Sequence, residues 1–287
     1  MMSDSRVPSL PKLSIVQAIE AALAEDLGLA GDVTTDAIVP SATRASGLIA
    51  ARKAGVVAGL TVAETAFRAL DPGVTFETLV ADGERAAAGT TVARVAGNAR
   101  ALLSAERVAL NFLARMSGIA TLTRTYVDAV AGTGAHICCT RKTTPGLRAF
   151  EKYAVRAGGG MNHRFALYDA VLIKDNHIVV AGSIGAAIAE VRRHVGHMVK
   201  IEVEVDSLMQ LEEVLQHKVD AVLLDNMTPS MLAAAVELVD GRLLTEASGG
   251  VTLNTVRAIA AAGVDLISVG ALTHSAPVLD IGLDFEM

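Results

Sequence analysis

The second half of the chain alternates between short apolar runs and longer amphipathic segments. The apolar runs are rich in β-forming residues, lead into polar or glycine residues, and cover 135–140, 169–174, 199–205, 220–225, 242–247 and 265–270. From residue 199 onward, each run is followed by apolar positions at helical spacing. Strands that alternate with helices are typical of a parallel sheet or barrel. We therefore predict six βα units, too few to close a full barrel.

Two of these runs resemble each other. YDAVLIKDN at 168–176 is similar to VDAVLLDN at 219–226, and each leads from a predicted strand to an acid-amide pair. Such self-similarity favours a barrel of repeated units, in which reactive groups gather at the carboxyl ends of the strands.

The first hundred or so residues follow a different pattern. Helical spacing covers 15–27 and 61–70, β-like runs lie near 44–58 and 74–80, and 82–97 has glycine-punctuated strand character. A long helical pattern follows over 104–130, with Gly118 as a plausible break. We therefore expect an N-terminal domain over 1–118, a barrel over 119–275, and a tail over 276–287 that packs back on the N-terminal domain.

The composition is that of an α/β protein rather than a disordered or secreted one. Hydrophobic residues make up 52% of the 287 positions, and tryptophan is absent. No run approaches the ~18 apolar residues of a membrane span, and the N-terminal MMSDSRVPSLPKLSI has no apolar signal region. We expect a cytoplasmic protein with no membrane partner. The adjacent Cys138 and Cys139 are expected to be small buried hydrophobes.

Positive charge is concentrated in one part of this acidic chain. The net charge is −6, yet residues 136–174 hold seven Lys and Arg against two acidic residues, a local charge of +5. The overall acidic balance argues against nucleic acid as a partner, because binding to its backbone needs a broad basic surface. Binding of a small anion needs only a local basic surface.

The basic residues of this part divide into two groups. Thr140, Arg141 and Lys142 follow the predicted strand 135–140, at the mouth of the barrel, although a solvated pair of cations is the alternative. Thr144 and Pro145 predict the start of a helix that ends at the glycines 158–160. Within it, the basic residues are spaced four apart, opposite an apolar face, which predicts a solvated face; they are Arg148, Lys152 and Arg156.

Three further basic residues are candidates for anion binding. His163 and Arg164 follow the triple glycine, and Lys174 stands at the carboxyl end of the strand 169–174. With Arg141 and Lys142 they could form one patch, in which the planar fork of arginine suits a carboxylate and lysine supplies a point charge.

Acidic residues follow on the next strands. In IEVEVD, three carboxylates share one face, which in a barrel is the inside: Glu202, Glu204 and Asp206. Asp225 ends the following strand. Buried carboxylates need cations, metal or ligand hydroxyls as partners. For Glu202 or Asp206, the alternative is an internal salt bridge to Lys200 or Lys174.

Glycine-rich turns follow the last two predicted strands. Ser248, Gly249 and Gly250 precede a helix expected to open with Thr252, and Gly270 follows the strand 265–270. Such turns expose backbone N–H groups and helix N-termini, which hold phosphate monoesters. The residues thus predict a barrel mouth for a multiply anionic molecule and a phosphorylated sugar-like one.

Seven motifs resemble the quinolinate phosphoribosyltransferase family, also called carboxylating nicotinate-nucleotide pyrophosphorylases. They are EDLGLAGDVTT (25–35), ERVALNFLARMSGIAT (106–121), TRKTTPGLRAFEKYAVRAGGGMNHR (140–164), LIKDNH (172–177), IEVEVDS (201–207), LLDNM (223–227) and ASGGV (247–251). The resemblance implies an α/β fold with an N-terminal α/β sandwich and an open, incomplete α/β barrel, of the type II phosphoribosyltransferase kind. It also implies that quinolinate and 5-phosphoribosyl 1-diphosphate react, with Mg²⁺, to give nicotinate mononucleotide, diphosphate and CO₂ in NAD biosynthesis.

The resemblance also assigns roles to residues. It places the quinolinate carboxylates on Arg141, His163, Arg164 and Lys174, with Thr140 beside them and Arg107 entering from a neighbouring subunit of a homodimer or hexamer. Lys142 would face the diphosphate. Glu204 and Asp225 would hold the ribose hydroxyls and water-bridged Mg²⁺, and the 5-phosphate would lie on Ser248, Gly249, Gly250 and Gly270. The residues expected to act in catalysis are Lys142, Lys174, Glu204 and Asp225.

Other interpretations differ in the acceptor or in the absence of catalysis. Gly250 stands where some relatives have asparagine, and glycine suffices if only backbone N–H groups bind. A paralogue of the same fold would use nicotinate or serve molybdenum transport, but four cations, including Arg107, favour a dicarboxylate. A non-catalytic phosphometabolite sensor would not need Glu204 and Asp225.

Overall fold

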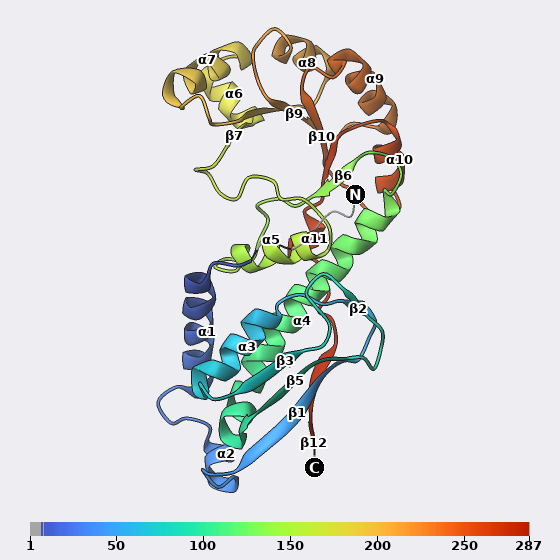
Figure 1. Ribbon diagram of the computed structural model, residues 1–287. Helices are drawn as coiled ribbons and strands as arrows, with labels where there is room; N and C mark the ends of the chain where they lie inside the picture. Colours follow the sequence, from blue (N-terminus) through green and yellow to red (C-terminus); the bar gives the residue numbers. More distant parts are fainter. Residues whose placement is uncertain (1–6, 8, 287) are drawn as a thin grey trace. The chain divides into compact units, whose positions relative to one another are not determined.

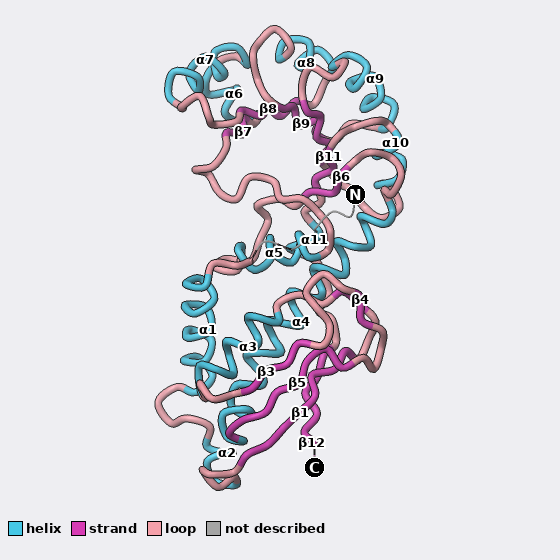
Figure 2. Tube along the Cα trace, in the orientation of Figure 1, coloured by secondary structure: helices cyan, strands magenta, loops and turns pink. Residues whose placement is uncertain are grey.

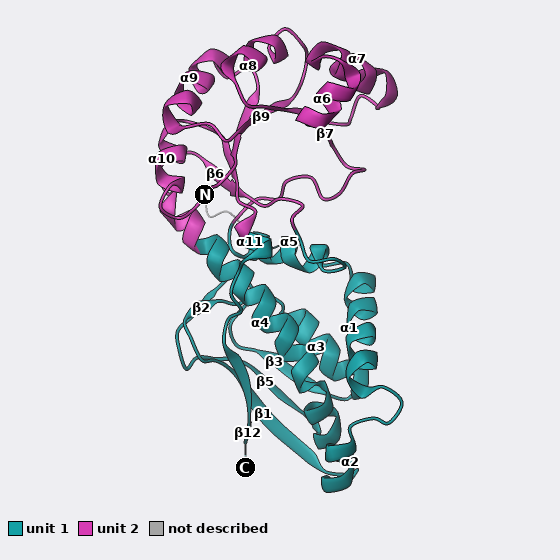
Figure 3. Cartoon of the chain, turned by 180° about the vertical axis from the view of Figure 1, so that it is seen from behind, with its two compact units in different colours: residues 1–124, 143–159, 272–287 teal, residues 125–142, 160–271 magenta. Residues whose placement is uncertain are grey.

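The computed structural model describes residue 7 and residues 9–286, in two compact units. Unit 1 comprises 1–124, 143–159 and 272–287, and unit 2 comprises 125–142 and 160–271 (Figure 3). Residues 1–6 and 8 of the N-terminal stretch in which no signal sequence was expected lie outside the described residues. Among the described residues, no helix combines the length and apolar content that a membrane span requires.

Unit 1 is built on a four-stranded antiparallel sheet. The strand order is β12 (Ile281–Glu286), β1 (Arg44–Ala51), β5 (Thr91–Asn98) and β3 (Thr75–Thr78), and β2 (Gly55–Val56) pairs separately with β4 (Arg85–Ala86). Its helices are α1 (Lys12–Leu27), α2 (Val33–Ile38), α3 (Leu60–Leu70), the first part of α4 (Ala99–Ala129) and α5 (Arg148–Ala157). Helix α3 and α4 lie along the sheet (Figure 1). Between them, Ile49, Phe67, Val92 and Leu102 are fully buried, so the apolar faces of sheet and helices form the core.

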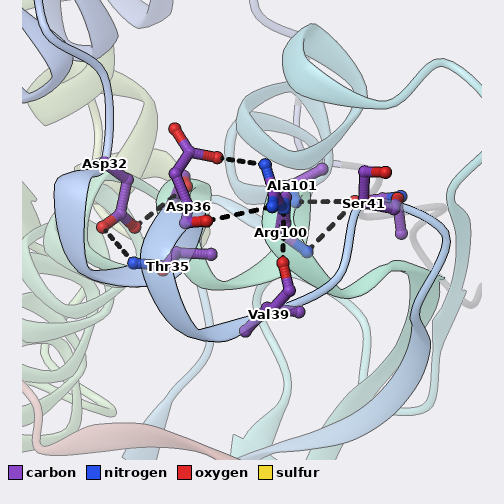
Figure 4. A network of polar contacts seen from close by, with 9 residues as sticks. Asp32, Thr35, Asp36, Val39, Ser41, Arg100 and Ala101 are labelled. Carbon is purple, nitrogen blue, oxygen red and sulfur yellow. Dashed lines mark hydrogen bonds and ion pairs between the residues drawn. The ribbon is translucent and has the colours of Figure 1, made fainter.

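The motif EDLGLAGDVTT folds into a polar network at the start of α4. Asp32 caps α2 by accepting a hydrogen bond from Thr35 N–H (2.9 Å), and its other oxygen accepts from Ser104 (3.0 Å). Hydrogen bonds from Thr35 hold the pKa of Asp32 below its usual value. Arg100 on α4 binds the Asp36 carboxylate (2.6 Å) and the Val39 carbonyl (2.6 Å) (Figure 4). The motif therefore ties the α2 segment to α4.

Helix α4 continues through Gly118, so the expected break at that residue is wrong. A Cβ atom at Gly118 would lie 2.0 Å from the carbonyl oxygen of Pro277. The glycine allows two parts of the chain to approach closely and does not interrupt the helix.

Unit 2 contains the six parallel strands that the sequence predicts. Their order is β6 (His136–Cys138), β11 (Leu266–Ser268), β10 (Leu244–Ser248), β9 (Ala221–Asp225), β8 (Ile201–Val205) and β7 (Val171–Ile173). The connecting helices are α6 (Asp175–Ala181), α7 (Ile184–His194), α8 (Leu208–Val214), α9 (Pro229–Val239) and α10 (Val256–Ala261). Helix α11 (Ala271–His274) follows β11 and belongs to unit 1 from Leu272 onward. The strands form a curved row with helices on its outer side (Figure 2). In this sheet β6 and β7 are the two edges, which makes the barrel open.

A short segment beyond β6 lengthens this row. Met161 forms a parallel bridge with Cys138, donates to the Ile137 carbonyl (2.8 Å) and accepts from Cys139 N–H (3.1 Å). The chain then passes through His163 and Arg164 on its way to β7. Both cysteines are buried, as expected.

Two predictions about the segment after β6 are wrong. Helix α5 begins at Arg148 and not at Thr144, because Gly146 has a left-handed backbone (φ +79°) that separates the two. Thr144 instead donates its N–H (3.0 Å) and hydroxyl (2.8 Å) to the carboxylate of Glu151. Lys152, expected on a solvated face, has only 1% of its surface exposed, whereas Arg156 is exposed.

Candidate functional site

Six of the predicted site residues of unit 2 lie at or just past the carboxyl ends of the strands, which brings them to one edge of the sheet, whereas His163 and Arg164 lie on the segment that leads to β7. Glu204 and Asp225 lie near the ends of β8 and β9, and Ser248 ends β10 directly opposite Asp225. Thr140, Lys174 and Gly270 each follow the end of a strand. The alternate positions Val203, Val222, Leu224 and Ile267 are fully buried on the side of the helices. This alternation turns the polar positions toward the inside of the barrel.

Lys174 and Glu204 form an ion pair at this edge. Lys174 Nζ lies 2.6 Å from Glu204 Oε2, and the side chains are 47% and 14% exposed. The motif LIKDNH explains how Lys174 is placed, since its backbone N–H donates to Nδ1 of His177 (2.9 Å) at the start of α6. A half-exposed cation beside a mostly buried carboxylate can exchange its partner for an anionic ligand.

The glycine turn after β10 lies against the end of β9. Asn226 donates its side-chain amide to Asp225 Oδ2 (2.6 Å) and its backbone N–H to the Ser248 carbonyl (2.9 Å). Gly249 and Gly250 both have left-handed backbones, with φ of +93° and +59°. A Cβ on Gly249 would lie 2.2 Å from Asn226 Oδ1, so only glycine fits there.

The helices behind the two glycine turns are short. Helix α10 begins at Val256 and not at Thr252, because Thr252 and Thr255 form a turn in which Thr255 N–H donates to the Thr252 carbonyl (3.1 Å). Helix α11 begins directly after Gly270 and has 4 residues. A phosphate bound at this edge would therefore depend on backbone N–H groups of the turns themselves more than on long helices.

Arg141 and Arg164 lie close enough to affect each other. The pKa of Arg164 is lowered, first by its burial and then by the positive charge of Arg141. Arg164 Nη1 also donates to the Ala170 carbonyl (3.0 Å). An anion bound near both arginines would offset their mutual repulsion, so the pair favours anion binding. Thr140 lies beside them and accepts a hydrogen bond from Lys142 N–H (3.1 Å).

His163 contacts two buried carboxylates, one of which the sequence analysis missed. His163 Nε2 lies 2.8 Å from Glu202 Oε2 and 3.9 Å from Glu246 Oε1. The Glu246 carboxylate also accepts a hydrogen bond from the Ser268 hydroxyl. The alternation of RLLTEAS, in which Glu246 shares a face with Ser248, could have indicated it.

The expected alternative partners of Glu202 and Asp206 are wrong. Glu202 pairs with His163, and Lys200 pairs with Asp220 (2.5 Å) outside the row of inner carboxylates. Asp206 follows the end of β8 and is exposed.

Two groups of residues could hold a divalent cation. Glu204 and Asp225 supply only oxygen atoms, which suits Mg²⁺ with water in most of its coordination sites. His163, Glu202 and Glu246 offer three ligand atoms within 4.8 Å of one another. Because this second group includes a ring nitrogen and Mg²⁺ prefers oxygen, the first group fits Mg²⁺ better.

Arg107 is the one predicted site residue that belongs to unit 1. It lies on α4, its side chain is 66% exposed, and Glu106 is 3.8 Å away.

Comparisons with known proteins identify the family. Residues 32–117 match the model of the quinolinate phosphoribosyl transferase N-terminal domain, and residues 119–284 match that of the C-terminal domain. The chain is 43% identical over 297 residues to quinolinate phosphoribosyltransferase (decarboxylating) 2, mitochondrial, of Nicotiana glauca, covering 97% of this chain and 84% of the relative. It is also 43% identical over 297 residues to the chloroplastic nicotinate-nucleotide pyrophosphorylase (carboxylating) of Arabidopsis thaliana, covering 97% and 85%.

A solved structure agrees with these matches. The crystal structure of NadC from Streptococcus pyogenes superposes with a TM-score of 0.93 at 42% identity, covering 98% of this chain and 100% of that one. The expected fold class, an N-terminal sheet domain with an open α/β barrel, is confirmed by this likeness. The chain belongs to the quinolinate phosphoribosyltransferase family.

Proposed function

We propose that this protein transfers the phosphoribosyl group of 5-phosphoribosyl 1-diphosphate to quinolinate and removes one carboxylate. The products are nicotinate mononucleotide, diphosphate and CO₂, in a step of NAD biosynthesis. Family membership supports the reaction. The observation that carries the proposal in this chain is the Lys174–Glu204 pair beside the Asp225–Ser248 strand ends, which joins a cation for the acceptor to carboxylates for a ribose.

The inner carboxylates suit the bond that breaks. The ring nitrogen of quinolinate attacks C1 of the ribose, and the C1–oxygen bond to diphosphate breaks with its electron pair leaving on diphosphate. Positive charge grows on the ribose in this step, and the carboxylates of Glu204 and Asp225 would stabilise it. Lys142 would stabilise the negative charge of the departing diphosphate.

Decarboxylation follows in this proposal once the new bond has formed. The positive charge of the pyridinium nitrogen then stabilises the electron pair left on C2 when CO₂ departs, and that pair takes a proton from solvent to form the C2–H bond. The protein orients the acceptor and needs no covalent nucleophile.

The cations suit an acceptor with two carboxylates. Arg141 and Arg164 repel each other, and Lys174 would release Glu204 when a carboxylate arrives. An acceptor with one carboxylate would leave part of this positive charge uncompensated. The 5-phosphate of the donor would be held by the turn at Ser248, Gly249 and Gly250 and by Gly270.

We further propose that the reaction requires Mg²⁺. When bound, it would neutralise charge on diphosphate, and Glu204 and Asp225 would hold it through water.

Acceptor selectivity tests the function. With the donor and Mg²⁺ present, we expect kcat/KM for quinolinate to exceed that for nicotinate by a hundredfold or more, since the second carboxylate gains charge-assisted bonds of about 1.5–3 kcal/mol each. Faster reaction of nicotinate would assign the protein to another acceptor. Donor binding without turnover of either acceptor would favour a sensor.

We further propose a homo-oligomer, a dimer or hexamer, in which Arg107 enters the site of a neighbouring subunit. Its exposed side chain on α4 supports this role. A mixture of inactive Arg107→Ala and Lys174→Ala proteins should regain up to about a quarter of wild-type activity, because one site in each mixed pair is intact. Subunit exchange without recovered activity would show that each site lies within one chain.

The two plant relatives are named as a mitochondrial and a chloroplastic protein, so relatives of this chain do not share one location in the cell. We propose the cytoplasm for this chain, which fractionation of its native cells would test.

A further inference from the structure

Two buried carboxylates inside the barrel have no role in the proposed reaction. Glu202 and Glu246 are 9% and 2% exposed, and they come from β8 and β10, which lie on either side of β9. Each occupies an inward position one alternation before a proposed site residue, Glu204 on β8 and Ser248 on β10. They therefore lie inside the barrel, directly below the strand-end site.

Burial of two ionised carboxylates so close together is unfavourable unless a cation or a set of donors compensates them. His163 Nε2 lies 2.8 Å from Glu202 Oε2 and 3.9 Å from Glu246 Oε1. The Ser268 hydroxyl donates to Glu246, and the charge of Arg164 is also felt at Glu202. The two carboxylates are thus organised around one imidazole ring.

This arrangement fixes the ring. An ionised carboxylate only accepts hydrogen bonds, so Nε2 of His163 is the donor toward Glu202 when that carboxylate is ionised, and the ring can bind a second carboxylate only when Nδ1 is protonated as well. With Nε2 directed at the carboxylates, Nδ1 faces away from them. Buried partners that hold the far nitrogen of a functional histidine set its tautomer and orientation in many sites.

A cavity of about 170 Å³ lies beside the cluster and is lined by all three residues. Its other walls include Val171, Ile201, Ala221 and Leu266, which begin their strands, so the cavity belongs to the amino-end side of the barrel. Lys200 and Asp220 close the same side with their own ion pair. The cluster therefore has space on the side opposite to the strand-end site, and its hydrogen bonds, more than close packing, hold the ring in place.

We propose that Glu202 and Glu246 are positioning residues that hold His163 in the orientation that binds a carboxylate of the acceptor. This role rests on the proposed function and adds to it: the two carboxylates set the affinity for the acceptor, whereas Glu204, Asp225 and the glycine turn act on the donor. Neither carboxylate touches a substrate in this account.

Steady-state kinetics of Glu202→Gln tests the role. The amide keeps the shape of the side chain but replaces a charge-assisted hydrogen bond by a neutral one, so KM for quinolinate should rise about tenfold. KM for the phosphoribosyl donor should stay within about twofold of wild type, because the donor is held by other residues. An equal rise of both KM values would overturn the proposal.

A double-mutant cycle asks whether Glu202 acts through His163. Adding Glu202→Gln to a His163→Asn protein should raise KM for quinolinate by less than about twofold, because the ring that it positions is gone. A full tenfold rise in that background would refute a positioning role. Lys200→Met is the matched control, because Lys200 lines the same cavity, is 78% exposed and does not touch His163.

A measurement on the wild-type protein, with His163→Asn used only to assign its signals, tests the proposal if Glu202→Gln does not fold. In ¹⁵N spectra of labelled histidine with quinolinate bound, the signals lost in His163→Asn should show both ring nitrogens protonated, and an unprotonated nitrogen at either position would refute the proposal. Wild-type turnover of quinolinate is recorded first. If it is absent, the proposed function fails, whereas turnover with a wrong KM pattern or a wrong protonation state removes only the role of Glu202 and Glu246.

Discussion

Replacement of Gly249 by alanine is expected to disturb the donor site more than replacement of any other glycine in the turn. Gly249 has φ +93°, and a Cβ there would lie 2.2 Å from Asn226 Oδ1 and 2.8 Å from Asn226 N. A left-handed backbone costs alanine about 1–2 kcal/mol. Overlap with a packed neighbour costs about 1–3 kcal/mol more. The free energy of unfolding should therefore fall by about 2–5 kcal/mol.

The same overlap should weaken donor binding. Asn226 bonds both Asp225 and the Ser248 carbonyl, so a Cβ that displaces it moves the proposed ribose and phosphate ligands together. If about 1.4 kcal/mol of the cost appears as lost binding, KM for the donor rises tenfold. Urea denaturation and steady-state kinetics measure the two effects.

Gly241→Ala is the matched control for this prediction. Gly241 precedes β10 at its other end, has φ +68°, and a Cβ there would meet nothing within 4 Å. Gly241→Ala should lower the free energy of unfolding by only about 1–2 kcal/mol, the cost of a left-handed backbone for alanine, and should leave KM for the donor unchanged. A wild-type KM for the donor in Gly249→Ala, or an equal rise of this KM in both variants, would refute the prediction.

Three other variants probe separate parts of the molecule. Lys174→Met should lower kcat/KM for quinolinate by about a hundredfold, because the Glu204 carboxylate and one acceptor carboxylate both lose their cationic partner, at a total cost of about 2–3 kcal/mol. A loss in kcat/KM below about threefold would remove Lys174 from the site. Glu151→Gln should reduce the free energy of unfolding by about 3 kcal/mol in urea, since the buried Glu151 pairs with Arg115 at 2.7 Å, whereas Glu64→Gln, from an exposed pair, should change it by less than about 1 kcal/mol. Hydrogen bonds from Asn98 and Gly73 N–H lower the pKa of Asp71, so its contribution is present above the unfolded pKa of about 3.9 and is lost as pH falls through the lower folded value. Asp71→Asn should make stability fall less steeply with acid below about pH 4, and an unchanged slope would contradict this.

Local patterns were sufficient to locate the strand-end residues. The alternation of IEVEV and the acid after AVLL place Glu204 and Asp225 at the ends of strands, because a strand turns successive side chains to opposite faces whatever its neighbours are. Lys174 followed from the same rule. The carboxyl ends of parallel strands share one edge, so the topology brings these residues together.

Features that depend on distant packing were not predictable in this way. Lys152 has the spacing of a solvated helix face, but a local period does not reveal whether another segment covers that face. From the sequence alone, Gly118 is expected to break the helix, because only the fold shows that Pro277 packs against this position and leaves no room for a Cβ. The group of His163, Glu202 and Glu246 joins three segments far apart in sequence, so only the fold brings them together.

This barrel is expected to couple phosphoribosyl transfer to decarboxylation of quinolinate. The most direct measurement is the yield of CO₂ and nicotinate mononucleotide from quinolinate, 5-phosphoribosyl 1-diphosphate and Mg²⁺, with wild-type protein and Glu204→Gln side by side. We predict equal amounts of the two products with wild type, and a rate lower by a hundredfold or more with the variant, since about 3 kcal/mol of charge stabilisation is removed. CO₂ without nicotinate mononucleotide, or equal rates in the two proteins, would contradict it.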